Sequence, residues 1–304
     1  MRPKIVIILG ATAVGKSAVA LRLAEHVNGE IVNADSQQVY RHMDIGTGKP
    51  SKADRERVRH HLIDIVAPNE EFNAALFRRL ATDSIGQIHA RERKVIVCGG
   101  TGLYLRALTH GLFEGPGQDP DVRNALEQEI ANSSLAVLYQ RLEKIDPTVG
   151  ATIHRNDRQR IIRALEVYQL TGRPLSEWHK EHGFQEDPFD ILKIGLLRER
   201  TELYDLINLR SERMIRDGFL EEVRGLVARG FDLALKPLRS VGYRQMGQVL
   251  RRLQRVEDAL EEMKQETRHL AKRQLTWFRR DEEIHWYHPE KQRREILQSA
   301  ETFL

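Results

Sequence analysis

The segment that most restricts the fold is GATAVGKS, at residues 10–17, because it separates two segments of different periodicity. The run before it, KIVIILG, is continuously apolar in its centre, which is typical of a strand buried on both faces of a sheet. The run after it, AVALRLAEHV, has apolar residues at helical spacing. A strand, a glycine-rich turn and a helix in this order predict the first half of a βαβ unit, in which the next strand is parallel.

Further apolar runs predict the other strands of a parallel sheet. EIVNAD, HLIDIV and KVIVCGG precede residue 101, and the helical pattern AALFRRLATDSIGQIHARER separates the last two. ILKIGLL, near residue 191, is expected to complete the same sheet. Strands that alternate with helices are typical of a sheet covered by helices on both faces, so the expected fold class is α/β.

A segment rich in glycine and proline, GLFEGPGQDPD at residues 111–121, interrupts this alternation. Three helices are predicted after it, in DPDVRNALEQEI, SSLAVLYQRLEKI and DRQRIIRALEVYQLTG, the last ending at Gly172 and Pro174. We therefore expect an α/β core with a basic helical C-terminal part and, between its two portions, a helical insertion domain. The expected boundaries are residues 1–114 and 188–304 for the core, and residues 115–187 for the insertion.

GATAVGKS matches the pattern GxxxxGK[ST] in the context that this pattern requires, directly after a strand and before a helix. We expect Lys16 to neutralise phosphate oxygens and the Ser17 hydroxyl to ligate Mg²⁺. The backbone N–H groups of the loop are expected to face the phosphates, and these belong to Gly10, Ala11, Thr12, Ala13, Val14, Gly15, Lys16 and Ser17. The core is thus predicted to be a P-loop NTPase-like parallel sheet flanked by helices. A glycine-rich turn without a ligand is the alternative.

The loop does not tell whether the bound group is an ATP tail or another pyrophosphate. A kinase of this class usually has a second carboxylate for Mg²⁺ at the end of a later strand. The obvious later strand ends in CGGTG, which has no acidic residue, and the nearest candidate is Asp35. This weakens the interpretation as an NTPase but does not exclude it.

Two polar residues follow strands that are expected to end beside the loop, namely Asp35 in NADSQQVY and Thr101 in GGTGLY. In an open parallel sheet, ligands bind beyond the carboxyl ends of the strands. Asp35 is then a natural proton acceptor, and Thr101 can donate a hydrogen bond to a phosphate oxygen. Each residue has an alternative role as the N-cap of the following helix.

Composition adds little about partners, because 48 Lys and Arg against 44 Asp and Glu give a net charge of only +4. The apolar run Ile5–Leu9 is too short for a membrane span or a signal peptide, so a cytoplasmic protein without a membrane partner is expected. The one cysteine, Cys98, is expected to be a buried structural thiol. His60 and His61 lack zinc spacing and are expected to be structural.

Taken in order, GATAVGKS, NADSQQVYRHMDIGTGKP, HHLIDIV and VCGGTGLYLRAL closely resemble the bacterial tRNA dimethylallyltransferase family. Similar segments follow in NDRQRIIRALEVYQLTGRPLS, LRSVGYRQM and KRQLTWFRR, so the resemblance runs from Ile5 to about Arg280. Only the phosphate loop is generic, whereas DSQQVYRHMDIGTGKP and GGTGLYLRAL together are specific. The one departure is Ser17, where many relatives have threonine, and it keeps the hydroxyl.

The resemblance implies transfer of a dimethylallyl group from dimethylallyl diphosphate to N6 of the adenosine on the 3′ side of the tRNA anticodon. The loop would then hold the leaving diphosphate, with Lys16, Thr101 and Mg²⁺ at Ser17 stabilising its charge. Asp35 would accept the proton of the amine. Arg123 matches a position near the substrates and is assigned to phosphate or tRNA contact, with a solvated arginine on a helix surface as the alternative.

The resemblance also implies contacts with the anticodon loop. Helical spacing puts Arg160 and Arg163 on one face while Ile161 and Ile162 pack inward, which a merely solvated amphipathic helix would also show. Cations around Trp277 suit phosphates and stacked bases, although the aromatic residues are also candidates for the core. The residues expected to contact tRNA are Asp35, Ser36, Gln37, Gln38, Gln159, Arg160, Ile161, Ile162, Arg163, Arg239, Ser240, Val241, Gly242, Tyr243, Arg244, Lys272, Arg273, Trp277 and Arg279.

Two other classes of function compete with a tRNA prenyltransferase. A small-molecule kinase with a P-loop would explain GATAVGKS but not the GGTGLYLRAL match or the basic C-terminal segment. A non-catalytic RNA-binding protein would bind tRNA in a salt-sensitive way and form no product. The expected oligomeric state is a monomer.

Overall fold

The computed structural model describes residues 2–113, 115–184 and 186–304. The chain divides into two compact units, one formed by Met1–Thr109 with Asp187–Leu304 and the other by His110–Glu186. The second unit is thus inserted between two portions of the first, in the region where the sequence predicts the insertion domain.

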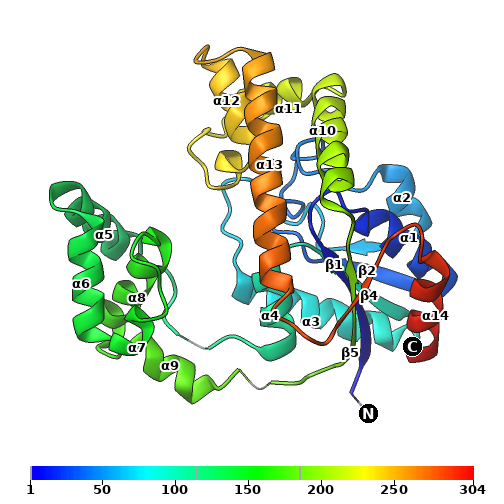
Figure 1. The fold of residues 1–304 in the computed structure, drawn as a ribbon, viewed down its shortest axis with the longest axis horizontal. Coiled ribbons are helices and arrows are strands. Elements are labelled where there is room, and N and C mark those ends of the chain that lie inside the picture. The colour runs from blue at the N-terminus through cyan, green and yellow to red at the C-terminus, as the bar shows by residue number, and fades with distance from the viewer. Residues whose placement is uncertain (1, 114, 185) are drawn as a thin grey trace. The chain divides into compact units, whose positions relative to one another are not determined.

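The first unit is built on one sheet of six parallel strands in the order β3-β2-β4-β1-β5-β6 (Figure 1). The strands are β1 (Lys4–Gly10), β2 (Gly29–Asn33), β3 (His60–His61), β4 (Lys94–Gly99), β5 (Asp190–Leu196) and β6 (Ile284–Tyr287). The run ILKIGLL lies in β5 and pairs with β1, from which the second unit separates it in the sequence. The predicted α/β class with a P-loop NTPase-like sheet is confirmed.

Helices cover both faces of this sheet. They are α1 (Lys16–His26), α2 (Lys52–Arg57), α3 (Ala74–Ala90), α4 (Gly102–His110), α10 (Arg200–Arg216), α11 (Phe219–Ala228), α12 (Tyr243–Leu250), α13 (Val256–Phe278), α14 (Arg293–Phe303) and the 3₁₀ turn η1 (Pro237–Arg239). Alternate residues of β1 enter different cores: Ile5 and Ile7 join one apolar cluster, Val6 and Ile8 the other. Burial on both faces explains why the sequence of β1 is continuously apolar.

The predicted strand HLIDIV is the main error in this unit, since the structure has a strand only at His60–His61. Leu62 and Asp64 have positive φ angles of 60° and 58°, so the backbone leaves the extended conformation. The Asp64 carboxylate lies 2.5 Å from Lys49 Nζ and 2.7 Å from Arg55 Nη1. The apolar pattern of this segment therefore failed to predict its structure, which is a loop stabilised by the ion pairs of Asp64.

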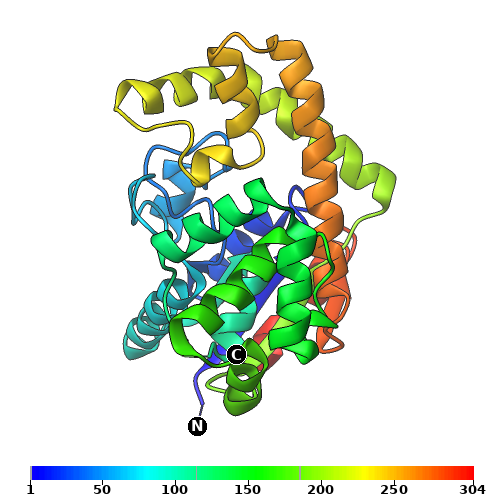
Figure 2. The ribbon, with the colours of Figure 1, turned by 90° about the vertical axis from the view of Figure 1, so that its left-hand side faces the viewer.

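The described residues of the second unit form five helices, in green in Figure 2, where three were predicted. They are α5 (Pro120–Asn132), α6 (Leu135–Ile145), α7 (Pro147–Gly150), α8 (Arg158–Thr171) and α9 (Leu175–His182). They share an apolar core that includes Leu138 and Ile161. The helix α8 ends as predicted at Gly172, which has a φ of 70°. The prediction missed α9 because Pro174 not only follows α8 but is itself the N-cap of α9.

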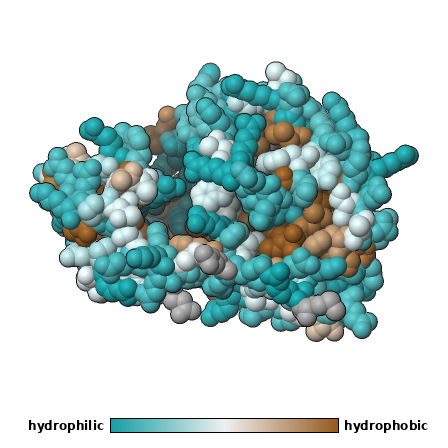
Figure 3. All heavy atoms as spheres, turned by 60° about the horizontal axis from the view of Figure 1, so that its bottom comes forward, coloured by the Kyte–Doolittle hydropathy of each residue, from teal (hydrophilic) through white to brown (hydrophobic). Residues whose placement is uncertain are grey.

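No helix in the described ranges is long and apolar enough to cross a membrane. Hydrophilic residues dominate the face of the molecule drawn in Figure 3.

Candidate active site

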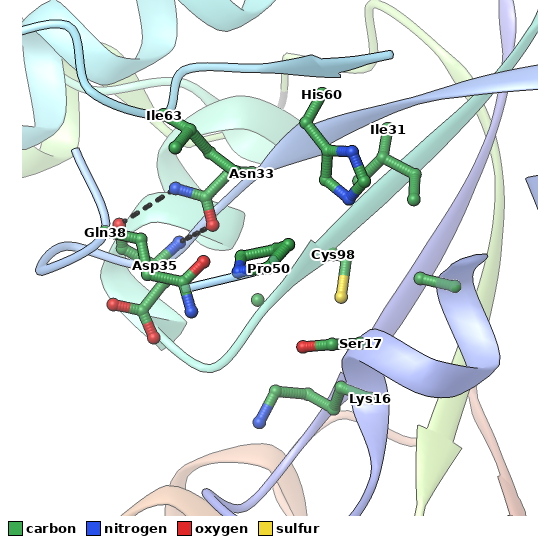
Figure 4. Close-up of a pocket in the computed structure, with 12 residues that line it drawn as sticks. Lys16, Ser17, Ile31, Asn33, Asp35, Gln38, Pro50, His60, Ile63 and Cys98 are labelled. Atoms are coloured by element: carbon green, nitrogen blue, oxygen red, sulfur yellow. Dashed lines mark hydrogen bonds between the residues drawn. The ribbon is translucent and has the colours of Figure 1, made fainter. Parts of the chain in front are cut away.

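The site lies at the carboxyl ends of the strands in the first unit, where β1, β2 and β4 run into loops. A pocket there is lined by the predicted residues Lys16, Ser17, Asp35 and Gln38, and also by residues that the sequence did not single out. Figure 4 shows Lys16 and Ser17 entering this pocket from α1, and Asp35 from the segment after β2. The remaining lining residues are Ala20, Ile31, Asn33, Pro50, His60, Ile63, Cys98 and Gly99.

The phosphate loop has the strained backbone that glycine permits. Gly10 and Gly15 have φ angles of 144° and 108°, and a Cβ at Gly10 would lie 2.7 Å from the carbonyl oxygen of Leu196. The helix α1 starts at Lys16, within the last residues of the loop motif, and no side chain of the described residues caps its N-terminus. Its first N–H groups and its dipole are therefore directed at the place where an anion would bind.

Lys16 folds back over the loop, because Nζ donates hydrogen bonds to the carbonyl oxygens of Gly10 (3.0 Å) and Ala11 (2.7 Å). Burial lowers the pKa of Lys16 to about 8, an effect that Cys98 and Asp35 partly offset and Arg210 reinforces. An arriving diphosphate would reverse this balance by stabilising the charged amine. Burial also raises the pKa of the Cys98 thiol to about 12, so the thiol stays protonated. The sequence predicted a buried Cys98, but the residue lines the pocket and is only half-buried.

Asp35 and Thr101 are brought together by the segment after β2. The Asp35 Oδ1 atom accepts a hydrogen bond from Gln37 N (2.8 Å), and Thr101 Oγ1 accepts one from Ser36 N (3.0 Å). Asp35 thus closes a local turn instead of capping a helix, and its second carboxylate oxygen is left for the pocket. Thr101 binds the segment 35–38 with its oxygen, so its hydroxyl hydrogen is available to a ligand. Their catalytic roles stay predictions.

An arginine that the sequence gave no reason to select, Arg210 on α10, lies against the phosphate loop. Its guanidinium donates to Thr12 Oγ1 (3.1 Å) and to the carbonyl oxygen of Thr47 (3.2 Å). Burial lowers its pKa, partly offset by Asp35, and no carboxylate in the described ranges forms an ion pair with it. A half-buried cation without a carboxylate partner among the described residues, beside a phosphate loop, is a ready partner for an anion.

His60 was expected to be only structural, yet it lines the pocket. Its Nδ1–H donates to the carbonyl oxygen of Val58 (2.7 Å), and burial lowers the pKa of the imidazole, so a neutral ring faces the site. His61 is structural as expected, with Nε2 at 2.6 Å from the Glu30 carboxylate. Only the tertiary placement of β3 distinguishes the two neighbours.

In the second unit, α8 presents Gln159 and Arg160 to solvent and buries Ile161 and Ile162, as the spacing predicted. The two isoleucines therefore support the helix from inside and are not surface contacts for RNA. Arg163 instead binds the fully buried Glu166 carboxylate (2.8 Å) and the carbonyl oxygen of Pro116 (2.7 Å).

Arg123 is neither a free surface arginine nor an open phosphate ligand in this structure. Its Nε and Nη2 donate to Oε1 (2.7 Å) and Oε2 (3.0 Å) of Glu166, a bidentate pair. Together with Arg163 it holds the pKa of this carboxyl below its usual value, although burial acts in the opposite direction and is the largest single influence. Arg123 and Arg163 thus neutralise a charge in the core of the helical unit.

We expect Arg123→Ala to lower the stability of the protein by about 1–3 kcal/mol, because a buried carboxylate loses its bidentate partner. Urea unfolding followed by circular dichroism would measure this, with Arg160→Ala, whose side chain is 61% exposed, as the matched control. If Arg123→Ala left stability unchanged and weakened substrate binding, the substrate-contact role would be correct.

The other predicted tRNA residues lie in the first unit. Tyr243 is buried at the start of α12 with its hydroxyl donating to Glu222 (2.7 Å), and Gly242 is also buried, so these two are not surface contacts. Burial of the ring, which packs edge-on to Phe219, is the reason. Residues with solvent-accessible side chains are Arg239, Ser240, Val241, Arg244, Lys272, Arg273, Trp277 and Arg279. Of the two neighbouring aromatic residues, Phe278 belongs to the apolar core, whereas Trp277 is exposed and remains a candidate for contact with RNA.

Comparison with known proteins points to one family. Residues 38–281 match the family model for IPP transferase. The chain is 50% identical over 285 residues to a tRNA dimethylallyltransferase of Geobacter metallireducens, covering 94% of this chain and 92% of the relative. It is 48% identical to a tRNA dimethylallyltransferase 2 of Syntrophus aciditrophicus, covering 100% of this chain and 97% of the relative.

Solved structures give the same result. A tRNA isopentenylpyrophosphate transferase from Bacillus halodurans superposes with a TM-score of 0.73 at 38% identity, covering 99% of this chain and 96% of the other. A eukaryotic dimethylallyltransferase acting on tRNA superposes with a TM-score of 0.81 at 29% identity, covering 98% of this chain and 77% of the other.

Proposed function

Because the chain belongs to the IPP transferase family, we propose that it transfers a dimethylallyl group from dimethylallyl diphosphate to N6 of the adenosine on the 3′ side of the tRNA anticodon. It is a prenyltransferase that modifies tRNA. One observation supports dimethylallyl diphosphate as the donor and Asp35 as the base. Lys16, Ser17 and Asp35 line the same pocket, so an anion-binding loop and a carboxylate lie side by side. The kinase interpretation is not favoured.

At the donor end, the allylic C–O bond breaks and negative charge develops on the diphosphate. Lys16, the backbone N–H groups at the start of α1 and the Arg210 guanidinium meet that charge. Each of these groups interacts more strongly with free diphosphate than with the intact ester, so they lower the barrier and do not merely bind the donor. The Thr101 hydroxyl would add one more hydrogen bond.

At the acceptor end, N6 forms the new C–N bond and must lose a proton. The Asp35 carboxylate lines the pocket, and among the described residues only its Oδ1 atom accepts a hydrogen bond, so it is the proposed proton acceptor. An adenine must leave its stack to reach such a pocket, which a single-stranded anticodon loop allows at a cost of a few kcal/mol.

The residues present fit Mg²⁺ held mainly by the diphosphate. Ser17 lines the pocket, and its hydroxyl has no hydrogen-bond partner in the described part of the chain. Among the described residues there is no group of three or more His, Cys, Asp or Glu side chains that could hold a metal ion. Mg²⁺ prefers phosphate oxygens and water with few protein ligands. When bound it would supply charge neutralisation to the leaving group.

The test is to incubate the protein with Mg²⁺, unmodified tRNA and dimethylallyl diphosphate and to analyse the tRNA nucleosides by mass spectrometry. A parallel sample contains ATP in place of the isoprenoid. A dimethylallyl mass increase on adenosine in the first sample alone is the expected result. Absence of product there, with phosphate transfer in the second, would overturn the proposal.

Arg210→Ala is expected to weaken inhibition by inorganic diphosphate about 10–100-fold, since a charge-assisted hydrogen bond from a half-buried guanidinium to the anion is lost. Arg213→Ala is the matched control, because Arg213 lies on the same helix and is exposed. Inhibition constants from competition against the donor would show the difference. An equal weakening in both variants would assign the effect to general surface charge and contradict the role of Arg210.

A further inference from the structure

The helix α13 reaches the candidate site through Gln274, which links two loops that are far apart in sequence. Gln274 Oε1 accepts a hydrogen bond from Thr12 N in the phosphate loop (2.8 Å), and Nε2 donates one to the carbonyl oxygen of Gly100 (2.9 Å). One side-chain amide therefore satisfies a donor of the loop after β1 and an acceptor of the loop after β4. These two loops carry Lys16 and Thr101.

Trp277, one helical turn further along α13, contacts the same segment. A Cβ at Gly102 would lie 2.3 Å from the Trp277 Nε1 atom, and a Cβ at Gly100 would lie 2.5 Å from Gln274 Nε2. Neither glycine has a positive φ, so glycine is needed here for space and not for its backbone freedom. The glycines on both sides of Thr101 are thus explained by the two side chains of α13 that pack against them.

The residues around Gln274 on this helical stretch are open to solvent. Lys272, Arg273 and Arg279 are exposed, and Trp277 keeps 38% of its surface exposed although its indole packs on Gly102. Arg273 lies four residues before Trp277 and so on the same face of α13, and a cation beside an accessible aromatic ring suits single-stranded RNA. The same turns of α13 therefore contribute exposed residues to the proposed tRNA surface and contact the Thr101 segment through Gln274 and Trp277.

We propose that Gln274 and Trp277 are positioning residues that hold Thr101 and the phosphate loop in one arrangement and couple docking of tRNA on α13 to binding of diphosphate. This inference rests on the proposed function. Without Gln274, Thr12 N–H and the carbonyl of Gly100 lose this partner, so the two loops lose a link beyond the paired ends of β1 and β4. Because coupling is reciprocal, tRNA must change the affinity for diphosphate by the same factor as diphosphate changes the affinity for tRNA.

The experiment measures the affinity for inorganic diphosphate with and without unmodified tRNA, in the whole protein and in Gln274→Ala, Trp277→Ala and Trp277→Phe. Gln265→Ala is the matched control, because Gln265 lies on α13 and is exposed. Thermal unfolding of each variant, and tRNA affinity by filter binding, are recorded in parallel.

We expect Gln274→Ala to weaken diphosphate binding about 10-fold in the absence of tRNA and to reduce the effect of tRNA on that binding to a factor near one. Trp277→Ala should also weaken diphosphate binding without tRNA, and Trp277→Phe should largely restore it, because a ring again packs on Gly102. A tryptophan that contacted only RNA would leave diphosphate binding without tRNA unchanged.

The inference is overturned if Gln274→Ala and Trp277→Ala bind diphosphate like the parent protein in the absence of tRNA, or if coupling persists in both. It is equally overturned if Gln265→Ala behaves as they do. The proposed function fails separately, if the parent protein forms no dimethylallyl adenosine from tRNA and dimethylallyl diphosphate.

Discussion

Asp35→Asn is expected to lower kcat by about 10²–10⁴-fold, the usual contribution of a positioned general base. Asparagine keeps the oxygen that accepts the hydrogen bond from Gln37 N, so the turn after β2 should survive while the proton acceptor is lost. The substitution therefore removes the proposed proton acceptor and keeps the hydrogen bond that holds the turn. Single-turnover prenylation of unmodified tRNA, measured by mass spectrometry, separates the chemical step from product release.

The matched control for this variant is Asp83→Asn, an exposed aspartate on α3 far from the pocket in sequence and absent from its lining. It should retain the parent rate. Since both variants remove one negative charge, the comparison cancels any effect of net charge on tRNA binding. A parent-like single-turnover rate in Asp35→Asn would show that another group, or water, accepts the proton.

Lys16→Met is the second substitution with a large expected effect, a loss of about 10²–10³-fold in kcat/KM for the donor. Methionine preserves most of the volume and removes the charge that meets the leaving diphosphate. Because burial lowers the pKa of Lys16 to about 8, the free protein loses this cation as the pH rises through about 8. The parent's kcat/KM should therefore fall above that pH, and the variant should lack this decline.

The lowered pKa of Lys16 also determines how its charge changes the stability of the fold with pH. The folded-state pKa lies below the ordinary value of 10.5, so the charged amine destabilises the fold below pH 8, and this cost disappears as the pH rises from 8 to 10.5. Lys16→Met should consequently not lower the melting temperature at pH 7. A variant that lost both activity and melting temperature would have failed for structural reasons and would contradict this account of Lys16.

Much of the site was visible in the sequence because local patterns encode it. GATAVGKS needs only a strand, a helix and glycines with special φ angles to form an anion site, and all of these are local properties. Asp35 comes just after the end of β2 at Asn33, and in a parallel sheet the ends of adjacent strands share one edge, so its position near the loop was predictable too.

Other features depended on contacts between distant segments and left no local signal. Arg210 and Gln274 reach the phosphate loop from residues about 200 and 260 positions away, and each sits in an ordinary helical pattern. Arg123, predicted to contact a substrate, meets Glu166, a residue whose complete burial no periodicity indicated. HLIDIV has the apolar pattern of a strand, but in the structure most of it is a loop in which Asp64 forms ion pairs with Lys49 and Arg55.

The sequence by itself thus determined the α/β class, the phosphate loop and the family, because periodicity, glycine positions and ordered motifs are properties of the chain. The tertiary structure alone decided which charges are neutralised and which stay available. Arg123 and Arg210 are both arginines on helices, but one is paired with a buried carboxylate and the other with neutral oxygens beside the loop. Pairing depends on which side chains the fold brings within hydrogen-bond distance, and a linear sequence does not contain that distance.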